Sequence, residues 1–278
     1  MENQNTNISH PGDDLLVVKD LCKTFKNGKK TVYALDHVSN VIKKNEKVVV
    51  IGPSGSGKST FLRCLNCMED PTGGSIFFEG EDLADMKVDI NKHREHIGMV
   101  FQQFNLFNNK TVLQNIMLAP VYIKTKKAGG LFASSAVKKQ IKAEAEATAH
   151  ELLAKIGLED KANVYPSTLS GGQKQRLAIA RAVARNAKIY IFDDSFSALD
   201  FKTDVAVRKA LREDMTDSTV FIVAQRVSTI LHADQILVLD EGKIVGKGTH
   251  KELMENCPVY EQIARSQLSE KEIAASIA

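Results

Sequence analysis

The stretch that decides the fold of this 278-residue chain is residues 52–59, Gly52-Pro53-Ser54-Gly55-Ser56-Gly57-Lys58-Ser59. A short β-branched run at residues 47–51 precedes it and is typical of a buried parallel strand, while residues 60–65 continue as a helix. The glycines let the backbone bend so that successive N–H groups point inward, and the helix N-terminus adds the positive end of its dipole. The stretch therefore predicts a phosphate-binding loop for a nucleoside triphosphate.

Two side chains in this loop carry the chemistry of nucleotide binding. We expect the Lys58 ammonium to reach the β- and γ-phosphates and the Ser59 hydroxyl to ligate Mg²⁺. The other positions expected to contact the nucleotide are Gly52, Ser54, Gly55, Ser56, Gly57 and Thr60.

Composition is typical of a globular protein with a sizeable core, since 43% of the residues are apolar. The chain is long enough for one large α/β domain or for a core with an inserted subdomain. The net charge of +3, from 37 basic and 34 acidic residues, is close to balance, so we expect no nucleic-acid partner and no direct binding to anionic membrane. The four cysteines fit a reducing compartment, and Cys64 and Cys67 form a C-x-x-C pair without a second pair at zinc spacing.

No apolar run approaches the ~18 residues that a membrane span needs. Residues 1–14 are polar and lack the basic start and apolar centre of a signal peptide, so we expect a disordered leader. The sequence thus predicts a cytoplasmic chain whose membrane role, if any, comes through a partner.

Strand and helix signals alternate along the chain. Residues 15–18 indicate an edge strand, residues 27–30 a hairpin turn, and residues 112–158 a helical region with an exposed loop at 124–135. Further strands are expected at residues 32–35, 75–78, 97–101, 189–192, 219–223, 235–239 and 243–245, with a helical tail from residue 259. This order predicts a mostly parallel α/β sheet with a helical insertion near residues 105–165.

Two further motifs concern phosphate and magnesium. The apolar strand at residues 189–192 ends in Asp193, an arrangement that can hold Mg²⁺ beside a phosphate-binding loop. Residues 169–173, Leu-Ser-Gly-Gly-Gln, come before a basic helix and indicate a second phosphate cradle at a helix start.

These motifs, with residues 197–200 (Ser-Ala-Leu-Asp), resemble the ATP-binding subunits of ABC transporters over roughly residues 15–270. The resemblance implies a P-loop NTPase with a RecA-like core, an N-terminal antiparallel β subdomain and an inserted α-helical subdomain. The implied domains are the leader (1–14), the first part of the ATP-binding core (15–104), the helical subdomain (105–165), the second part of the core (166–257) and a helical tail (258–278).

The resemblance also implies that two such domains pack head to tail, with each ATP between one phosphate-binding loop and the partner's Leu-Ser-Gly-Gly-Gln. The second cradle then consists of Ser170, Gly171, Gly172 and Gln173. Phe25 would stack on adenine, although Tyr33 is a rival and Phe25 could be a core aromatic. Gln102 would ligate Mg²⁺ and couple the site to the helical insertion, and Asp200 would contact the opposing site.

Two positions depart from the family pattern. Active members have Glu after the strand Asp and His near the end of the next strand, whereas this chain has Asp194 and Gln225. The shorter Asp194 carboxylate should fall short of the attacking water, and Gln225 has no titrating nitrogen. Because general-base catalysis contributes ~10²–10⁴-fold, we expect an attenuated ATPase that still binds ATP, unless Asp194 acts through a shifted water.

The two halves resemble different branches of the family. Residues 15–186 look like polar amino-acid importer ATPases, and residues from 189 onward look like the impaired-site domain of heterodimeric multidrug exporters. A natural mosaic and an engineered chimera both fit this change.

The leading interpretation is an ATP-binding subunit that serves a separate transmembrane permease for polar amino acids, peripheral to the inner face of the membrane. The alternatives are an exporter-type domain that holds ATP for regulation and an ABC protein without a transporter.

Overall fold

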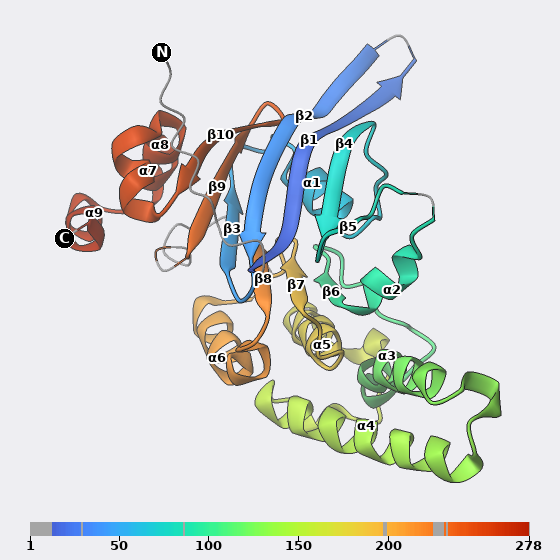
Figure 1. Cartoon of the computed structure of the whole chain (residues 1–278). Coiled ribbons are helices and arrows are strands. Elements are labelled where there is room, and N and C mark those ends of the chain that lie inside the picture. The colour runs from blue at the N-terminus through green and yellow to red at the C-terminus, as the bar shows by residue number, and fades with distance from the viewer. Residues whose placement is uncertain are drawn as a thin grey trace. The chain divides into compact units, whose positions relative to one another are not determined.

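The computed structural model describes residues 13–28, 30–85, 87–196, 199–224, 231 and 233–277 (Figure 1). The chain divides into two compact units. The first consists of Met1–Ile90 and Arg226–Ala278, and the second of Asn91–Gln225. Most of the predicted leader, residues 1–12, lies outside the described residues.

An antiparallel sheet of the first unit has the strand order β2-β1-β4-β5. Its strands are β1 (Asp14–Asn27), β2 (Lys30–Lys43), β4 (Gly73–Phe78) and β5 (Glu81–Asp82). The prediction of an edge strand at residues 15–18 is wrong, because β1 pairs with β2 on one side and with β4 on the other. The sequence of β1 alone cannot show that a segment more than fifty residues away covers its second edge.

Three other strands of the first unit support the phosphate-binding loop. They are β3 (Lys47–Ile51), β9 (Gln235–Asp240) and β10 (Lys243–Gly248). β3 runs parallel to β9, and β10 is antiparallel to β9. Residues 48–51 of β3 are fully buried, as the β-branched run predicts.

Helices complete the first unit. α1 (Lys58–Leu65) follows the phosphate-binding loop and buries Phe61, Leu62, Cys64 and Leu65. The predicted helical tail is confirmed as α8 (Pro258–Gln267) and α9 (Glu270–Ile277), which follow α7 (His250–Asn256).

In the second unit, three parallel strands stand in the order β8-β7-β6. They are β6 (Ile97–Val100), β7 (Ile189–Phe192) and β8 (Thr219–Val223), and β6 and β7 are buried throughout. Their helices are α2 (Ile90–Glu95, which starts at the unit boundary), α5 (Gly171–Val183) and α6 (Phe201–Leu211). Parallel strands alternating with helices confirm the predicted α/β class.

The predicted helical insertion is confirmed as α3 (Val112–Lys127) and α4 (Ser135–Lys155), which pack against each other. The exposed loop predicted at residues 124–135 is too long, because α3 continues to Lys127 and a short 3-10 turn forms at Gly130–Phe132. Lysines in the last turn of α3 favour the helix through its dipole, and Lys126 also pairs with Glu95 at 3.0 Å. Of the helices in the described residues, none is long and apolar enough to cross a membrane.

Candidate nucleotide-binding site

The phosphate-binding loop has a backbone that only glycine can adopt without strain. Gly52 has φ 151°, Gly55 φ 81° and Gly57 φ 100°. A Cβ at Gly52 would lie 1.9 Å from the carbonyl oxygen of Leu239, and one at Gly57 would lie 2.2 Å from that of Ala34. The loop is therefore pressed against two neighbouring strands at both of its ends.

The middle of the loop is open. A Cβ placed at Gly55 meets no atom within 4 Å, and Ser54 and Gly55 are exposed. Ser56 is 3% exposed and anchors the loop, since its carbonyl accepts a 3.2 Å bond from the Gly242 N–H. The loop thus has fixed ends and an exposed centre, as a phosphate cradle requires.

Lys58 lies over this loop. Its ammonium donates to the carbonyl oxygens of Gly52 at 2.9 Å and Pro53 at 2.7 Å. The N-cap of α1 is Gly57, which offers no side-chain acceptor, and the first turn has no acidic residue. The positive end of the α1 dipole is therefore not neutralised by its own cap, and an anion is favoured there. Ser59 and Thr60 follow in the first turn, both partly buried.

The second unit holds the carboxylates predicted for magnesium and water. Asp193 follows the buried strand β7, is 2% exposed, and its N–H donates to the Val100 carbonyl at 2.9 Å. Ser195, which the sequence did not single out, is fully buried, and its hydroxyl donates to the same carbonyl at 2.8 Å. These bonds tie the end of β7 to the end of β6 and fix the backbone on both sides of Asp194.

The structure brings two of the predicted residues of this unit together. The Gln102 amide donates to the Asp194 carboxylate at 3.4 Å, a long hydrogen bond. Asp194 has φ 50°, in the left-handed region that a non-glycine residue rarely adopts. Backbone strain of this kind costs about 1–3 kcal/mol and is concentrated at functional sites.

The predicted second cradle is the N-terminus of α5. Ser170 is its N-cap and accepts from the Gln173 N–H at 3.3 Å, while the Gln173 side chain accepts from the Ser170 N–H at 2.8 Å. This reciprocal capping box occupies both side chains within the helix itself. Gly171 is exposed and has space for a Cβ, so the start of α5 is open to solvent.

Three arginines in and just after α5 have structural roles. Arg176 donates to the Ile156 carbonyl at 2.7 Å and Arg181 to the Asn105 carbonyl at 2.6 Å. Arg185 donates to the carbonyl of Arg94. Burial lowers the pKa values of Arg181 and Arg185, which remain cations. These three arginines therefore brace the second unit, because each donates to a backbone carbonyl of another segment.

Phe25 and Asp200 have local contacts of their own. Phe25, at the hairpin end of β1, is 40% exposed and lies 5.0 Å from the Lys23 ammonium, so it is not a core aromatic. Tyr33 on β2 is 64% exposed. Asp200 is the N-cap of α6, and the hydrogen bonds from Thr203 lower the pKa of its carboxyl.

The predicted site residues divide between the units. The first unit holds Phe25 and residues 52–60, and the second holds Gln102, Asp193, Asp194, Ser170 to Gln173 and Asp200. Gln225, like residues 197–198, lies outside the described residues. The C-x-x-C pair has no thiolate character at Cys64, because burial raises the pKa of that thiol to about 12.

Comparison with known proteins places this geometry in a family. The family model described as ABC transporter matches residues 35–197, more than half of the chain. The chain belongs to the ABC transporter family. It is therefore an ATP-binding domain of that family, with the ABC ATPase cassette fold.

The similar proteins include two transport subunits and several solved structures. The arginine transport ATP-binding protein ArtM of Bacillus subtilis is 46% identical over 86% of this chain and 92% of its own length. The glutamine transport ATP-binding protein GlnQ of the same organism is 42% identical over 84% and 93%.

Among solved structures, the ATP-binding cassette MJ0796, a dimer bound to ADP and Pi, has a TM-score of 0.74 and 34% identity over 84% of this chain and 98% of that one. A bacterial Atm1-family ABC exporter with ATP bound has a TM-score of 0.72 and 29% identity, and covers 96% of this chain and 44% of that chain.

Proposed function

We propose that this chain is the ATP-binding subunit of an amino-acid importer, which binds Mg-ATP at a dimer interface and hydrolyses it slowly. The observation that carries the proposal is the phosphate-binding loop on α1, whose helix end has no side-chain cap, in a chain of the ABC transporter family. An uncapped helix N-terminus beside Lys58 is suited to the phosphates of ATP.

The residues present fit a magnesium nucleotide. Ser59 offers a hydroxyl, Gln102 an amide oxygen and Asp193 a carboxylate, and oxygen donors of these kinds are the ones Mg²⁺ prefers. We assign these three as its ligands, with Mg²⁺ neutralising charge on the phosphates. Lys58 and the loop N–H groups hold the phosphates, and Phe25, exposed on β1, stacks on the adenine.

A second copy of the chain completes the site in this proposal. Ser170, Gly171, Gly172 and Gln173 of one subunit close over the nucleotide held by the other subunit's loop, and Asp200 contacts the opposing site. MJ0796, with 34% identity, is described as a dimer with ADP and Pi, which supports this assembly.

The partner and solute follow from the relatives. ArtM and GlnQ are named arginine and glutamine transport proteins, and both align along most of this chain. We therefore propose a transmembrane permease for polar amino acids as the partner, which holds the chain at the inner face of the cell membrane.

Slow hydrolysis follows from Asp194 and Gln225. The Asp194 side chain is one methylene shorter than Glu, its backbone has φ 50°, and the bond that its carboxylate accepts from Gln102 is long, at 3.4 Å. Without a well-placed base, the rate should fall by ~10²–10⁴-fold relative to active members.

The test is steady-state ATPase activity with Mg²⁺ for the wild type and for the double variant Asp194→Glu/Gln225→His, while light scattering follows dimerisation. We expect a nearly inactive wild type that dimerises with ATP, and a turnover at least tenfold faster in the double variant. A robust wild-type turnover that the substitutions do not raise would contradict the proposed attenuation. A chain that does not bind ATP would contradict the proposed function itself.

A second candidate is the ATP-holding domain of a heterodimeric exporter, either natural or as one half of a chimera. Asp194 and Gln225 favour it, as does the alignment of an exporter structure along 96% of this chain. The two candidates differ in partner. An exporter half-site would form ATP-dependent heterodimers with a chain that carries Glu and His at these positions, whereas the importer subunit forms homodimers.

A further inference from the structure

A bulge in the first unit gathers a thiol, a carboxylate and an imidazole that the nucleotide site does not use. Leu21 pairs with Val38 and Lys23 with Leu35, so Cys22 on β1 stands opposite two residues of β2. Those two residues are Asp36 and His37. One residue facing two is the pattern of a β-bulge, which turns side chains toward positions that a regular ladder does not allow.

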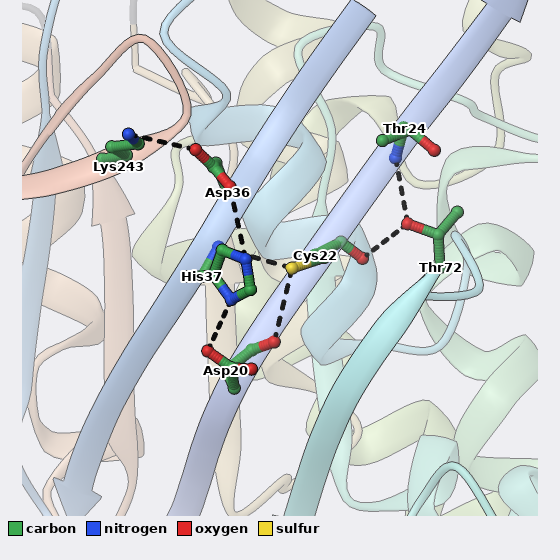
Figure 2. Close-up of polar contacts among 7 residues, drawn as sticks. All are labelled: Asp20, Cys22, Thr24, Asp36, His37, Thr72 and Lys243. Carbon is green, nitrogen blue, oxygen red and sulfur yellow. Dashed lines mark hydrogen bonds and ion pairs between the residues drawn. The ribbon is translucent and has the colours of Figure 1, made fainter.

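The three side chains offer ligand atoms at short range (Figure 2). The Cys22 sulfur, a carboxylate oxygen of Asp36 and a ring nitrogen of His37 all lie within 4.8 Å of one another. The Asp36 Oδ1 atom is 3.7 Å from Nε2 of His37. Ligands that share one metal ion at bond lengths of ~2.0–2.3 Å are separated by about 3–4 Å, so only small rotations would close the set.

A fourth residue orients the imidazole. Asp20 Oδ1 lies 2.7 Å from Nδ1 of His37, which holds the proton on Nδ1 and leaves Nε2 as the lone-pair nitrogen on the side of Asp36. A carboxylate bonded to the far nitrogen of a histidine is the usual support of a histidine ligand. Asp20 and His37 both have positive φ, 53° and 54°, so the backbone on both strands is bent to make this contact.

The backbone around Cys22 is fixed in the same way. The backbone N–H of His37 donates to the Cys22 sulfur at 3.4 Å, which fixes the position of the sulfur beside the imidazole. The Cys22 carbonyl accepts from the Thr72 N–H at 2.8 Å and from its hydroxyl at 3.2 Å. Contacts from His37, Asp20 and Thr72 therefore hold Cys22 in place, as Figure 2 shows.

We propose that Cys22, Asp36 and His37 form a binding site for Zn²⁺, with Asp20 as the positioning residue for His37. Thiolate, imidazole and carboxylate are the ligand types of zinc, whereas Mg²⁺ takes oxygen ligands. Lys243 pairs with the other oxygen of Asp36, Oδ2, at 3.1 Å, so Oδ1 faces the imidazole. The fourth tetrahedral position faces solvent and takes water, because the His37 side chain is 67% exposed.

Binding displaces protons in a defined way. The Cys22 thiol, which donates to the Asp20 carbonyl at 3.5 Å, loses its proton to solvent, and the metal–sulfur bond replaces that contact. His37 binds through Nε2, which carries no proton when Nδ1–H donates to the Asp20 carboxylate.

The test is titration of the nucleotide-free chain with Co²⁺ as a spectroscopic probe, followed by displacement with Zn²⁺ in competition with a chromophoric chelator. We expect one Co²⁺ per chain with thiolate-to-metal charge-transfer absorption, and no loss of that absorption in excess Mg²⁺. Cys22→Ser should lose the absorption and bind Zn²⁺ at least tenfold more weakly. Asp20→Asn should keep the absorption and weaken binding by ~10–100-fold.

Cys67→Ser is the matched control, because Cys67 is a partly buried thiol outside the cluster, and it should bind like the wild type. If Cys22→Ser does not fold, His37→Gln tests the site in its place, because it replaces an exposed side chain. A wild type without thiolate absorption, or a Cys22→Ser or His37→Gln chain with unchanged zinc affinity, would overturn the site. None of these readouts depends on ATP hydrolysis, so they test the site independently of the proposed function.

Discussion

The two glycine-rich helix starts of this chain, at α1 and at α5, differ in how their donors are used. At α1 the cap is Gly57, with φ 100° and no side chain, and the loop before it is locked against neighbouring strands. At α5 the cap is Ser170, which closes a capping box with Gln173, and the adjacent Gly171 meets no neighbour.

Glycine-rich helix starts of similar composition can therefore differ in how their N–H donors are prepared for an anion. The α1 end is shaped for an anion by its own chain, because strain and close packing force the loop into one conformation. The α5 end is a capped, exposed helix start, and in our proposal it meets a nucleotide only when a second chain brings one to it. We therefore expect substitutions at the start of α1 to have large effects on ATP binding, and substitutions at the start of α5 to have small ones.

Lys58→Ala should have the largest effect. The ammonium would make two or more charge-assisted hydrogen bonds to phosphate, each worth about 1.5–3 kcal/mol, so ATP affinity should fall by ~10²-fold or more. Isothermal titration calorimetry measures this ATP affinity. Lys139→Ala, an exposed lysine on α4, is the control and should bind ATP like the wild type. Equal affinity of the Lys58 variant and this control would contradict the assignment of the loop.

Gly57→Ala and Gly171→Ala should change the free energy of unfolding by different amounts. A Cβ at position 57 would meet the Ala34 carbonyl at 2.2 Å in a left-handed backbone, so we expect at least about 2 kcal/mol of destabilisation together with weaker ATP binding. At position 171 the Cβ meets no atom and φ is not positive, so helix propensity should make the change neutral or stabilising by up to about 1 kcal/mol. Urea unfolding measures both. Similar losses in the two variants would remove the distinction.

Ser170→Ala should have a smaller effect, confined to α5. Loss of the cap costs about 1 kcal/mol of stability. In the isolated subunit, ATP affinity should stay unchanged, because the phosphate-binding loop does not involve Ser170. A large drop in the ATP affinity of the monomer would show that α5 contributes to nucleotide binding at the phosphate-binding loop of the same chain.

A third helix, α6, has a charged N-cap, Asp200, and we expect its substitution to change stability the least. Hydrogen bonds from Thr203 hold the pKa of this carboxyl below its ordinary value. The folded state therefore gains stability while the carboxyl is ionised, and loses that gain as the pH falls below about 4 through the folded-state pKa. The melting temperature of the wild type should fall slightly more between pH 5 and pH 3 than that of Asp200→Asn, measured by thermal scans. Parallel pH profiles would contradict this role.

Sequence reasoning succeeded where the chemistry is local. Residues 52–59 and the flanking strand and helix depend on glycine positions and β-branched residues that neighbour one another in the chain. It failed where a distant segment decides the outcome. β4 makes β1 an interior strand, and backbone carbonyls far along the chain bind the arginines of α5. The Cys22, Asp36 and His37 cluster was missed for the same reason, since only the bulged register of two strands brings its members together.

We propose that one ATP is held by the phosphate-binding loop of one chain and the α5 start of another. The most direct test mixes Lys58→Ala chains with Ser170→Arg chains in Mg²⁺ and ATP, and measures mass by light scattering and bound nucleotide by filtration. Each variant alone should remain monomeric, while the mixture should form dimers with one ATP per dimer, because only the mixed pair has one complete site. A mixture that stays monomeric while the wild type dimerises, or a variant that dimerises alone, would contradict the account.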